Sequence, residues 1–484
     1  IGAFVANTIN DTRPVEHGYV SINGYNDVGF DHYYYVTDDK EVWTNPSYNF
    51  NAEHKFDTLG TNLSLSLDFA NFSNTSNRKS ESVFLKGDNS YAKPIQLYQS
   101  NNNSKINIFT QKLDFQTYIK PTWFFETGAK GTFVNNVTDF VFQRQDTVTS
   151  SLLVDTAFTN NYRYKETLIA GYVNIRKEFK KGTVSVGVRA ENTEITGYNV
   201  TNGFKLTRSY LNFFPNFSID YQLTEKQTIQ LNYGRRLDRP NSFPLNPCKR
   251  FEDQYAVSAG NPYLNPQYSN NIDLVHTYNQ SVTNSIGYAH FNQLFSDVTF
   301  QNDSTKISTF IPVNLDESDY YYYNLFFQKQ FKSWWNMEVS LNVYYTSFKS
   351  KVGNSVLNTN TISSNIYFNN DFILPKNFKM QLTVHYNAPN KYAANYNKSH
   401  GRCASGIKKA LYKGKFNIMV QFLDMFYTDI SRTVYDFDNQ YYTFNSYDDT
   451  RRFRLTLSYK FGKTNIQVKD KSGNEQESGR LNRN

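Results

Sequence analysis

The sequence is poor in cysteine, in long apolar runs and in clustered charge. Its 484 residues include only two cysteines, too few for a fold held together by disulfides. No apolar run approaches the roughly 18 residues that a membrane-spanning helix needs, and the mean hydropathy is -0.63. The net charge of +8 is modest and the basic residues form no long run, which argues against a nucleic-acid partner. These absences exclude a disulfide scaffold and a helical membrane protein.

Aromatic residues and period-2 alternation are what the sequence has in abundance. The chain contains 38 Tyr and 40 Phe, residues that favour strands and that disordered chains lack. Apolar and polar residues alternate over 62–69, 184–191 and 211–223. Such alternation predicts strands with one apolar and one polar face. No segment of comparable length has the period of a helix, so we predict an all-β protein.

Strand length and the polar faces favour a membrane barrel over a soluble sandwich. The alternating segments run for roughly 9–13 residues, which fits a tilted strand that crosses a bilayer. Their polar faces carry Asp68, Arg189 and Glu191, which a dry core would bury at high cost and a wet lumen accommodates. We therefore predict a large antiparallel transmembrane β-barrel of the outer membrane. On this reading Leu455 faces lipid and Arg454 faces the lumen.

Short and long connections alternate along the chain. Short turns, such as 57–60 and 180–182, predict the periplasmic end of the barrel. Long polar stretches, which we assign to extracellular loops, lie between them at 73–103, 138–160, 237–267 and 388–400.

The count of alternating segments gives about 18 strands. Trp123, Trp334 and Trp335 lie beside short turns, which indicates a periplasmic aromatic belt. We expect one barrel domain over 1–461, followed by a polar periplasmic tail over 462–484.

Several strings in the sequence resemble one family. Residues 231–240 read LNYGRRLDRP, 245–247 read LNP and 260–268 read GNPYLNPQY. Together they resemble the "RR(I/L)xRP … LNP … GNPxLxPxY" loop of TonB-dependent receptors, and most of all the outer-membrane β-barrel family within them. The matching residues of the last string are Gly260, Asn261, Pro262, Leu264 and Pro266.

Three strands look like those of the same family. They are VRAENT at 188–193, RSYLNFFP at 208–215 and the closing strand at 455–462, with an aromatic β-signal at Tyr459 and Phe461. The resemblance covers nearly the whole chain. It implies a 22-stranded barrel, an N-terminal plug and a TonB box that couples transport to the inner membrane. We identify no plug or box in this sequence, and we expect them and the first strands of the family to lie outside it.

The resemblance also implies partners. They are outer-membrane lipid and lipopolysaccharide, TonB, and a surface lipoprotein or other outer-membrane subunits. No nucleic acid and no cofactor are expected.

Clustered tyrosines and arginines are the candidate ligand contacts. The tyrosine runs fall in regions that we assign to loops, where they form either an aromatic girdle or a stacking platform for a ligand such as a glycan or peptide. The arginines, with Lys249 and Arg250, either bind an anion such as lipopolysaccharide phosphate or pair with Asp238, Glu252 and Asp253. The candidate contacts are Tyr33, Tyr34, Tyr35, Arg235, Arg236, Arg239, Tyr320, Tyr321, Tyr441 and Tyr442.

The sequence shows no pattern typical of catalysis. Its seven histidines lack metal-ligand spacing, and we find no G-x-S-x-G or P-loop string. We therefore predict no catalytic residue, no metal site and no enzyme activity. Cys248 and Cys403 both fall near the outer rim of the barrel, where a disulfide and two free thiols remain alternatives.

Three functions are compatible with such a barrel. The first is uptake, in the manner of TonB-dependent receptors, of a nutrient too large for general porins. The second is a passive channel without a plug, and the third is a structural or docking subunit of an outer-membrane assembly. In each case we expect both edges of the sheet to be paired, because unpaired backbone groups are costly in hydrocarbon.

Overall fold

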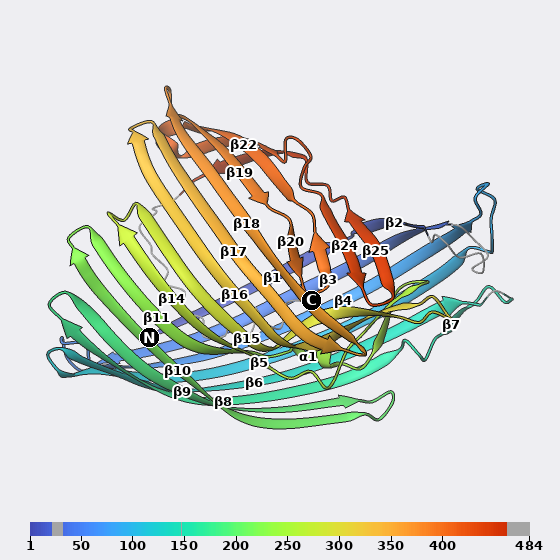
Figure 1. Ribbon diagram of the computed structural model, residues 1–484, viewed down its shortest axis with the longest axis horizontal. Coiled ribbons are helices and arrows are strands. Elements are labelled where there is room, and N and C mark those ends of the chain that lie inside the picture. The colour runs from blue at the N-terminus through green and yellow to red at the C-terminus, as the bar shows by residue number, and fades with distance from the viewer. Residues whose placement is uncertain (22–31, 147, 462–484) are drawn as a thin grey trace.

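The computed structural model describes residues 1–21, 32–146 and 148–461, which form a curved antiparallel wall (Figure 1). The tail that we expect at 462–484 lies outside the described residues. No helix in the described ranges has the length and apolar character needed to span a membrane. The one α-helix among the described residues, α1 (Ser242–Leu245), is a single turn, and a 3-10 turn covers Tyr412–Gly414.

The wall begins with β1 and β2, which pair one after the other with β3. From β3 onward each wall strand pairs with the next in an unbroken antiparallel meander. The wall strands are β1 (Gly2–Thr12), β2 (Val15–Ser21), β3 (His32–Lys55), β4 (Asn62–Leu85), β5 (Gln96–Lys120), β6 (Trp123–Gln145), β8 (Asn160–Phe179), β9 (Gly182–Asn199), β10 (Lys205–Thr224), β11 (Gln227–Asp238), β14 (Gln267–Tyr278), β15 (Val282–Gln301), β16 (Ser308–Lys332), β17 (Trp335–Val352), β18 (Ser355–Leu374), β19 (Phe378–Asn387), β22 (His400–Leu411), β23 (Phe416–Leu423) and β26 (Arg452–Tyr459).

The remaining strands belong to the connections at one end of the wall. They are β7 (Leu152–Val154), β12 (Lys249–Asp253), β13 (Ala256–Ala259), β20 (Asn390–Tyr392), β21 (Asn395–Asn397), β24 (Ser431–Phe437) and β25 (Gln440–Ser446). The last four of these make a separate four-stranded sheet.

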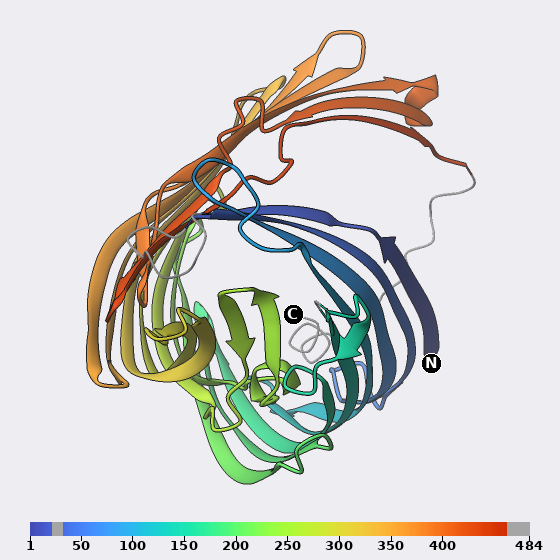
Figure 2. The same ribbon diagram turned by 90° about the vertical axis from the view of Figure 1, so that its right-hand side faces the viewer.

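The number of times that the chain runs along the wall, each run being one pass, agrees with the number of strands predicted from the sequence. The main sheet contains 22 strands, but β7, β12 and β13 are loop strands, and β1 with β2 makes one interrupted pass. The described residues therefore make 18 passes of the wall, as the sequence predicts. Among the described residues, β1 and β26 each pair along one edge only, and Figure 2 shows them as the two separate ends of the curved wall.

The two faces of the wall follow the predicted alternation. Val188 and Leu457 lie on the outer face and are largely exposed, whereas Asp68 and Glu191 are buried on the lumen side. Arg189 contacts Glu191 in the lumen at 2.9 Å, and Arg454 lines a pocket on the inner face. The predicted orientation of lipid-facing and lumen-facing residues is confirmed.

The strands are longer than the sequence indicates. The segment 73–103, which we assigned to a loop, lies mostly within β4 and β5, which are 24 and 25 residues long. Their outer faces change from apolar, at Phe69 and Phe109, to polar, at Asn71 and Asn107, whose side chains hydrogen-bond each other at 2.6 Å. Strand pairing continues above the apolar band. This is possible because a strand whose outer face is polar can be surrounded by water instead of lipid. The wall thus extends well beyond the membrane on the long-loop side.

The short connections collect at the opposite end. In one of them, Asp57 Oδ1 accepts hydrogen bonds from the backbone N–H groups of Leu59, Gly60 and Thr61, each at 2.9 Å. A hydrogen bond from the Thr61 side chain, with these backbone bonds, holds the pKa of the Asp57 carboxyl below its usual value. Trp123 and Trp335 begin strands directly after short turns, as the predicted belt requires.

Candidate functional site

The connection between β11 and β14 folds into the lumen. Figure 2, seen from the long-loop end, shows β12 and β13 standing inside the curved wall. They form a hairpin, and β13 also pairs in parallel with the start of β16. We call residues 239–266 the inward segment.

Side chains on three strands fix the inward segment to the wall. Arg208 of β10 donates a hydrogen bond to the carbonyl of Pro262 at 2.7 Å and a second to the carbonyl of Leu264. Asn136 of β6 donates to Ser242 at 2.6 Å, and Asn160 of β8 donates to Asn246 at 3.1 Å. The segment is therefore held by polar groups that project from the lumen face of β6, β8 and β10.

Apolar packing reinforces these bonds. Leu245 and Leu264 of the inward segment are fully buried against Tyr162, Tyr164 and Leu206 of the wall. Apart from the period-2 placement of its wall residues, no pattern in the sequence predicted this cluster. Arg208, Asn136 and Asn160 were likewise missed as anchors, although alternation places all three on the lumen face.

The string GNPYLNPQY supplies the contacts on the segment's side. Pro262, Leu264 and Pro266 are buried and alternate with exposed residues, as in an extended chain packed on one face. Asn261 donates to the carbonyl of Pro312 at 3.0 Å. Gly260 passes so close to the carbonyl oxygen of Asn246 that a Cβ atom there would overlap it. The motif is an anchor for the inward segment.

The candidate arginines do not form one anion site. Arg235 lies on the outer face, with its guanidinium 5.2 Å from the ring of Tyr268. Arg236 is next to it on the lumen face, and Arg239 is buried in an ion pair with Glu191. Consecutive residues of a strand point to opposite sides, so the side chains of this arginine run lie on different faces of the wall.

Lys249 and Arg250 belong to the inward segment, as Arg239 does, and Arg250 and Arg239 line the same pocket. Arg250 stacks on the ring of Phe243, 3.8 Å from its centroid, and donates to Ser258 at 3.1 Å. It therefore supports the packing of the segment itself.

The tyrosine runs 33–35 and 320–323 lie in strands β3 and β16, which corrects their assignment to loops. Tyr33 is fully buried against Phe84, with ring centroids 5.2 Å apart, whereas Tyr34 faces outward. Tyr320 points into the lumen and Tyr321 outward, where its ring lies 4.6 Å from that of Tyr288. Aromatic residues at consecutive positions cover both faces of a strand, so these runs build no single platform.

The third tyrosine run, 441–442, lies in β25 of the separate sheet. Tyr442 stacks on Tyr435 at 4.9 Å and hydrogen-bonds Thr299 at 3.1 Å, which docks that sheet on β15. Tyr441 is exposed. At the end of the wall, Tyr459 closes β26, and Phe461 follows as an exposed residue.

The two cysteines are free in the structure. Cys248 is buried in the inward segment, and Cys403 lies in β22. Burial raises the pKa of the Cys248 thiol to about 11. The described residues contain no group of three His, Cys, Asp or Glu side chains that could hold a metal ion.

A cavity of about 350 Å³ separates the inward segment from β3–β6. Its wall side is rich in amides and hydroxyls, including Asn74, Asn102 and Thr138, while Trp43 and Phe251 add aromatic surface. Charged groups from both sides line the same space: Asp39 and Glu41 on β3, and Arg250 and Glu252 of the segment. The cavity offers hydrogen-bonding groups of both kinds and apolar rings, as solute-binding sites do.

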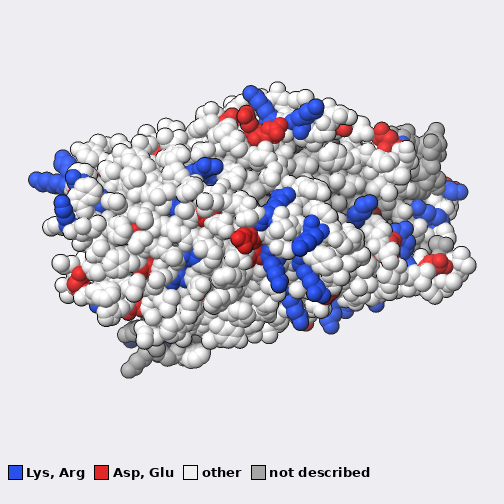
Figure 3. Space-filling model, turned by 90° about the horizontal axis from the view of Figure 1, so that it is seen from below, with Lys and Arg blue, Asp and Glu red and all other residues white. Residues whose placement is uncertain are grey.

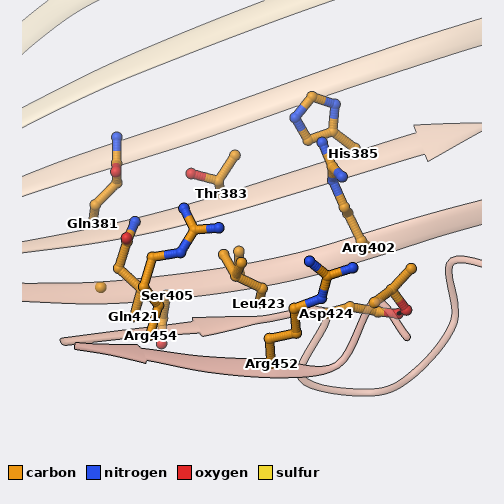
Figure 4. A pocket seen from close by; sticks show the side chains of 13 residues that line it. Gln381, Thr383, His385, Arg402, Ser405, Gln421, Leu423, Asp424, Arg452 and Arg454 are labelled. Atoms are coloured by element: carbon orange, nitrogen blue, oxygen red, sulfur yellow. Dashed lines mark hydrogen bonds between the residues drawn. The ribbon is translucent and has the colours of Figure 1, made fainter. Parts of the chain in front are cut away.

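A second cavity, of about 420 Å³, lies on the lumen face of β19, β22, β23 and β26. Figure 4 shows Arg402, Arg452 and Arg454 extending into it beside His385. Arg402 contacts Asp429 at 3.7 Å, and Arg452 donates to the carbonyl of Asp449. The pocket's acid, Asp424, instead accepts hydrogen bonds from Thr428 and Thr450. The cavity is therefore basic.

A wall of alternating strands, an apolar outer band, a polar lumen and an inward segment together define an outer-membrane β-barrel. The family comparison agrees: residues 54–459 match the model of the outer membrane protein beta-barrel family. The chain belongs to this family. The predicted resemblance to the outer-membrane β-barrel family is thus confirmed over these residues.

Solved outer-membrane structures share the fold at low identity. The pyoverdine outer membrane receptor FpvA of Pseudomonas aeruginosa PAO1 gives a TM-score of 0.59 at 11% identity, covering 94% of this chain and 72% of that one. The FrpB iron transporter of Neisseria meningitidis gives 0.53 at 11% identity, with coverage of 95% and 77%. The ferric yersiniabactin uptake receptor FyuA of Yersinia pestis gives 0.52 at 12% identity, with coverage of 94% and 74%. No curated protein matches the sequence.

Proposed function

We propose that this protein is an outer-membrane transport barrel of the TonB-dependent receptor type, which takes up a nutrient too large for general porins. The observation that carries the proposal is the inward segment. It fills part of the lumen and lines two cavities, one of about 350 Å³ against β3–β6 and one of about 590 Å³ against β15 and β16. A selective transporter needs such solute-sized sites, whereas a general porin needs an unobstructed pore.

The fold is consistent with this function. The matched structures include proteins named as an iron transporter, a ferric yersiniabactin uptake receptor and a pyoverdine outer membrane receptor, and the chain covers 72–77% of these three. By analogy with TonB-dependent receptors, the partners are TonB on the periplasmic side, outer-membrane lipid and lipopolysaccharide around the wall, and a surface lipoprotein or other subunit at the long loops.

A growth experiment tests the proposal. Deletion of the gene in the native bacterium should slow growth on one class of limiting nutrient, and a plasmid copy should restore it. Uptake of that nutrient by the complemented strain should stop when the inner-membrane proton gradient is collapsed, because TonB-type transport requires it. Uptake that continues after collapse would favour a passive channel and overturn the proposal.

A docking role predicts a different result. In that case, deletion leaves the uptake of every nutrient unchanged and removes other proteins from the outer membrane. Quantitative proteomics of outer membranes from the deletion strain distinguishes this outcome.

A further inference from the structure

The basic cavity on the lumen face of β19, β22, β23 and β26 gathers positive charge from three strands. Its lining contains Arg402, Arg452, Arg454 and His385, against one carboxylate, that of Asp424. The four basic residues belong to β19, β22 and β26, and Figure 4 shows their side chains extending to the same side of the sheet. The cavity is therefore a candidate site for an anion.

The alternation of β26 directs its two arginines inward. Arg452 and Arg454 alternate with Phe453 and Leu455, which are exposed on the outer face. Figure 3 shows one outer side of the wall, and most of that surface is formed by uncharged residues. Because an arginine in contact with lipid is costly, the lumen is the face on which these charges can be placed.

Small residues form the floor of the cavity. Ala404 and Gly406 occupy consecutive inward positions of β22. Gly406 lies opposite Gln421, which in turn lies opposite Arg454. Because neighbouring strands are about 4.8 Å apart, the backbone of Arg454 lies roughly 10 Å from that of Gly406. The hollow thus results from the small residues of β22, and a larger side chain there would fill it.

The arginines reach this floor from two directions. Arg402 lies four residues from Gly406 along β22, which is about 13 Å, and it lies opposite His385 on β19. Arg452 and Arg454 come from β26, two strands away on the other side. A ligand that contacts arginines from both directions must carry anionic groups at more than one position.

The arginines keep most of their hydrogen-bond donors free. Arg402 lies 3.7 Å from Asp429, which is longer than a hydrogen bond. Arg452 donates to the carbonyl of Asp449 through Nε, one of the five N–H groups that a guanidinium side chain carries. In the part of the chain that the structure describes, no hydrogen bond or ion pair involves Arg454. The three side chains can therefore donate to a ligand.

The acid of the lining is occupied by other donors. Asp424 accepts hydrogen bonds from the backbone N–H groups of Thr428 at 3.1 Å and Asp429 at 3.2 Å. It also accepts one from the hydroxyl of Thr450 at 2.6 Å. Three guanidinium groups against the carboxylates of Asp424 and Asp429 leave an excess of positive charge in the cavity.

We propose that this cavity binds a small solute that carries two or more phosphate or carboxylate groups. Guanidinium groups bind both kinds of anion through paired N–H donors. The volume of about 420 Å³ lies within the range of about 300–1,000 Å³ that is typical of small-molecule sites. The inference rests on the transport proposal, because it names the charge class of the transported solute.

Binding to the purified protein tests the site. The full-length protein in detergent is titrated calorimetrically with fructose bisphosphate and with tricarballylate, a tricarboxylate, and fructose is the uncharged control. At least one of the two anions should bind wild type saturably, and fructose should not. The variant R402Q/R452Q/R454Q should bind that anion at least tenfold more weakly, since the loss of one hydrogen bond to a charged group weakens binding by a factor of about ten or more.

Two further variants separate the cavity from the general charge of the lumen. The control K112Q/R144Q/R176Q removes three cations from the lumen face of β5, β6 and β8 and should bind the anion as wild type does. Gly406→Leu keeps every arginine but fills the cavity, because a Cβ atom at Gly406 meets no atom closer than 3.4 Å and the side chain can extend from the floor. It should weaken binding at least tenfold. Heat-modifiable migration on gels confirms that each variant is folded.

Several results of the titration would overturn the inference. One is the absence of saturable binding of both anions to wild type, as expected if other acids of the full-length protein neutralise the arginines. Others are unchanged binding by R402Q/R452Q/R454Q, equal weakening in the two triple variants, and unchanged binding by G406L. Binding of fructose as tight as that of the anions would also overturn it.

An uptake experiment separates the failure of this inference from the failure of the transport proposal. The deletion strain is complemented with wild type or with R402Q/R452Q/R454Q, and uptake of the nutrient found in the growth experiment is measured. Full restoration of gradient-dependent uptake by the triple variant would overturn the anion site and leave the transport proposal intact. Uptake by wild type that survives collapse of the gradient would overturn the transport proposal, while the titration would still decide whether the cavity binds anions.

Discussion

Arg208 of β10 and Pro262 of the inward segment, 54 residues apart in the chain, are joined by a hydrogen bond of 2.7 Å from the guanidinium to the carbonyl oxygen. The same side chain also donates to the carbonyl of Leu264. One arginine thus anchors the last turn of the inward segment before the chain re-enters the wall at β14.

We expect Arg208→Ala to loosen the inward segment without disturbing the wall. Two carbonyls lose a charged donor, and hydrogen bonds to charged groups contribute about 1.5–3 kcal/mol each. Limited proteolysis in detergent should therefore cut within 239–266 much faster than in wild type. The matched control is Arg235→Ala on the outer face of β11, which should leave cleavage unchanged. Equal cleavage of R208A and wild type would show that Arg208 is not the anchor.

We expect Gly260→Ala to destabilise the protein more than Gly234→Ala. A Cβ at Gly260 would overlap the carbonyl oxygen of Asn246, whereas a Cβ at Gly234 meets no atom within 4 Å. Relief of such an overlap by backbone movement costs about 1–3 kcal/mol. Thermal unfolding in detergent, followed by circular dichroism, compares the two variants. Equal melting temperatures would contradict the close packing at Gly260.

A charged residue introduced on the outer face of β9 should lower the free energy of unfolding, whereas one introduced on the inner face should not. Val188 faces lipid near the middle of the apolar band, so Val188→Arg should lower the free energy of unfolding by about 2–4 kcal/mol. Ser185→Arg on the lumen face of the same strand should cause no comparable loss. Urea unfolding in lipid vesicles measures both. A greater loss for S185R than for V188R would invert the assigned faces.

The thiol of Cys248 should resist alkylation until the pH is very high. Burial disfavours the thiolate and raises the pKa to about 11, so at pH 8 roughly one molecule in a thousand carries the reactive anion. In a Cys403→Ser background, N-ethylmaleimide labelling of the folded protein should be slow at pH 8 and accelerate as pH rises towards 11. Unfolding in denaturant should make labelling fast at pH 8. Fast labelling of the folded protein would place Cys248 in contact with water.

Both edges of the wall should be paired in the membrane. An open edge leaves several backbone N–H and C=O groups of β26 without partners in hydrocarbon, at several kcal/mol each. Solid-state NMR of the protein in native outer membranes should therefore give hydrogen-bonded amide-proton shifts at every residue of Arg452–Tyr459, including those that point away from β23. Non-bonded shifts at alternate residues would contradict the closed barrel.

Much of the architecture could be predicted from the sequence, because the face on which a strand residue lies depends only on its place in the two-residue alternation along that strand. Alternation at 184–191 specifies that Val188 faces lipid and Arg189 the lumen, whatever lies next to the strand. The short turns and the count of 18 passes follow from the same local signal. Strand length was underestimated at β4 and β5, because a polar outer face does not distinguish a loop from a strand that has risen above the lipid.

The candidate site was decided by tertiary structure. Arg235 and Arg239 are near neighbours in sequence, yet one lies over Tyr268 on the outer face and the other is buried against Glu191. The bond from Arg208 to Pro262 joins a wall strand to a loop that is distant in the chain. The sequence by itself determined which side of the wall each residue faces, since that depends on a two-residue period. Only the folded wall decided which residues meet, because strand register and the path of a long connection depend on contacts between distant segments.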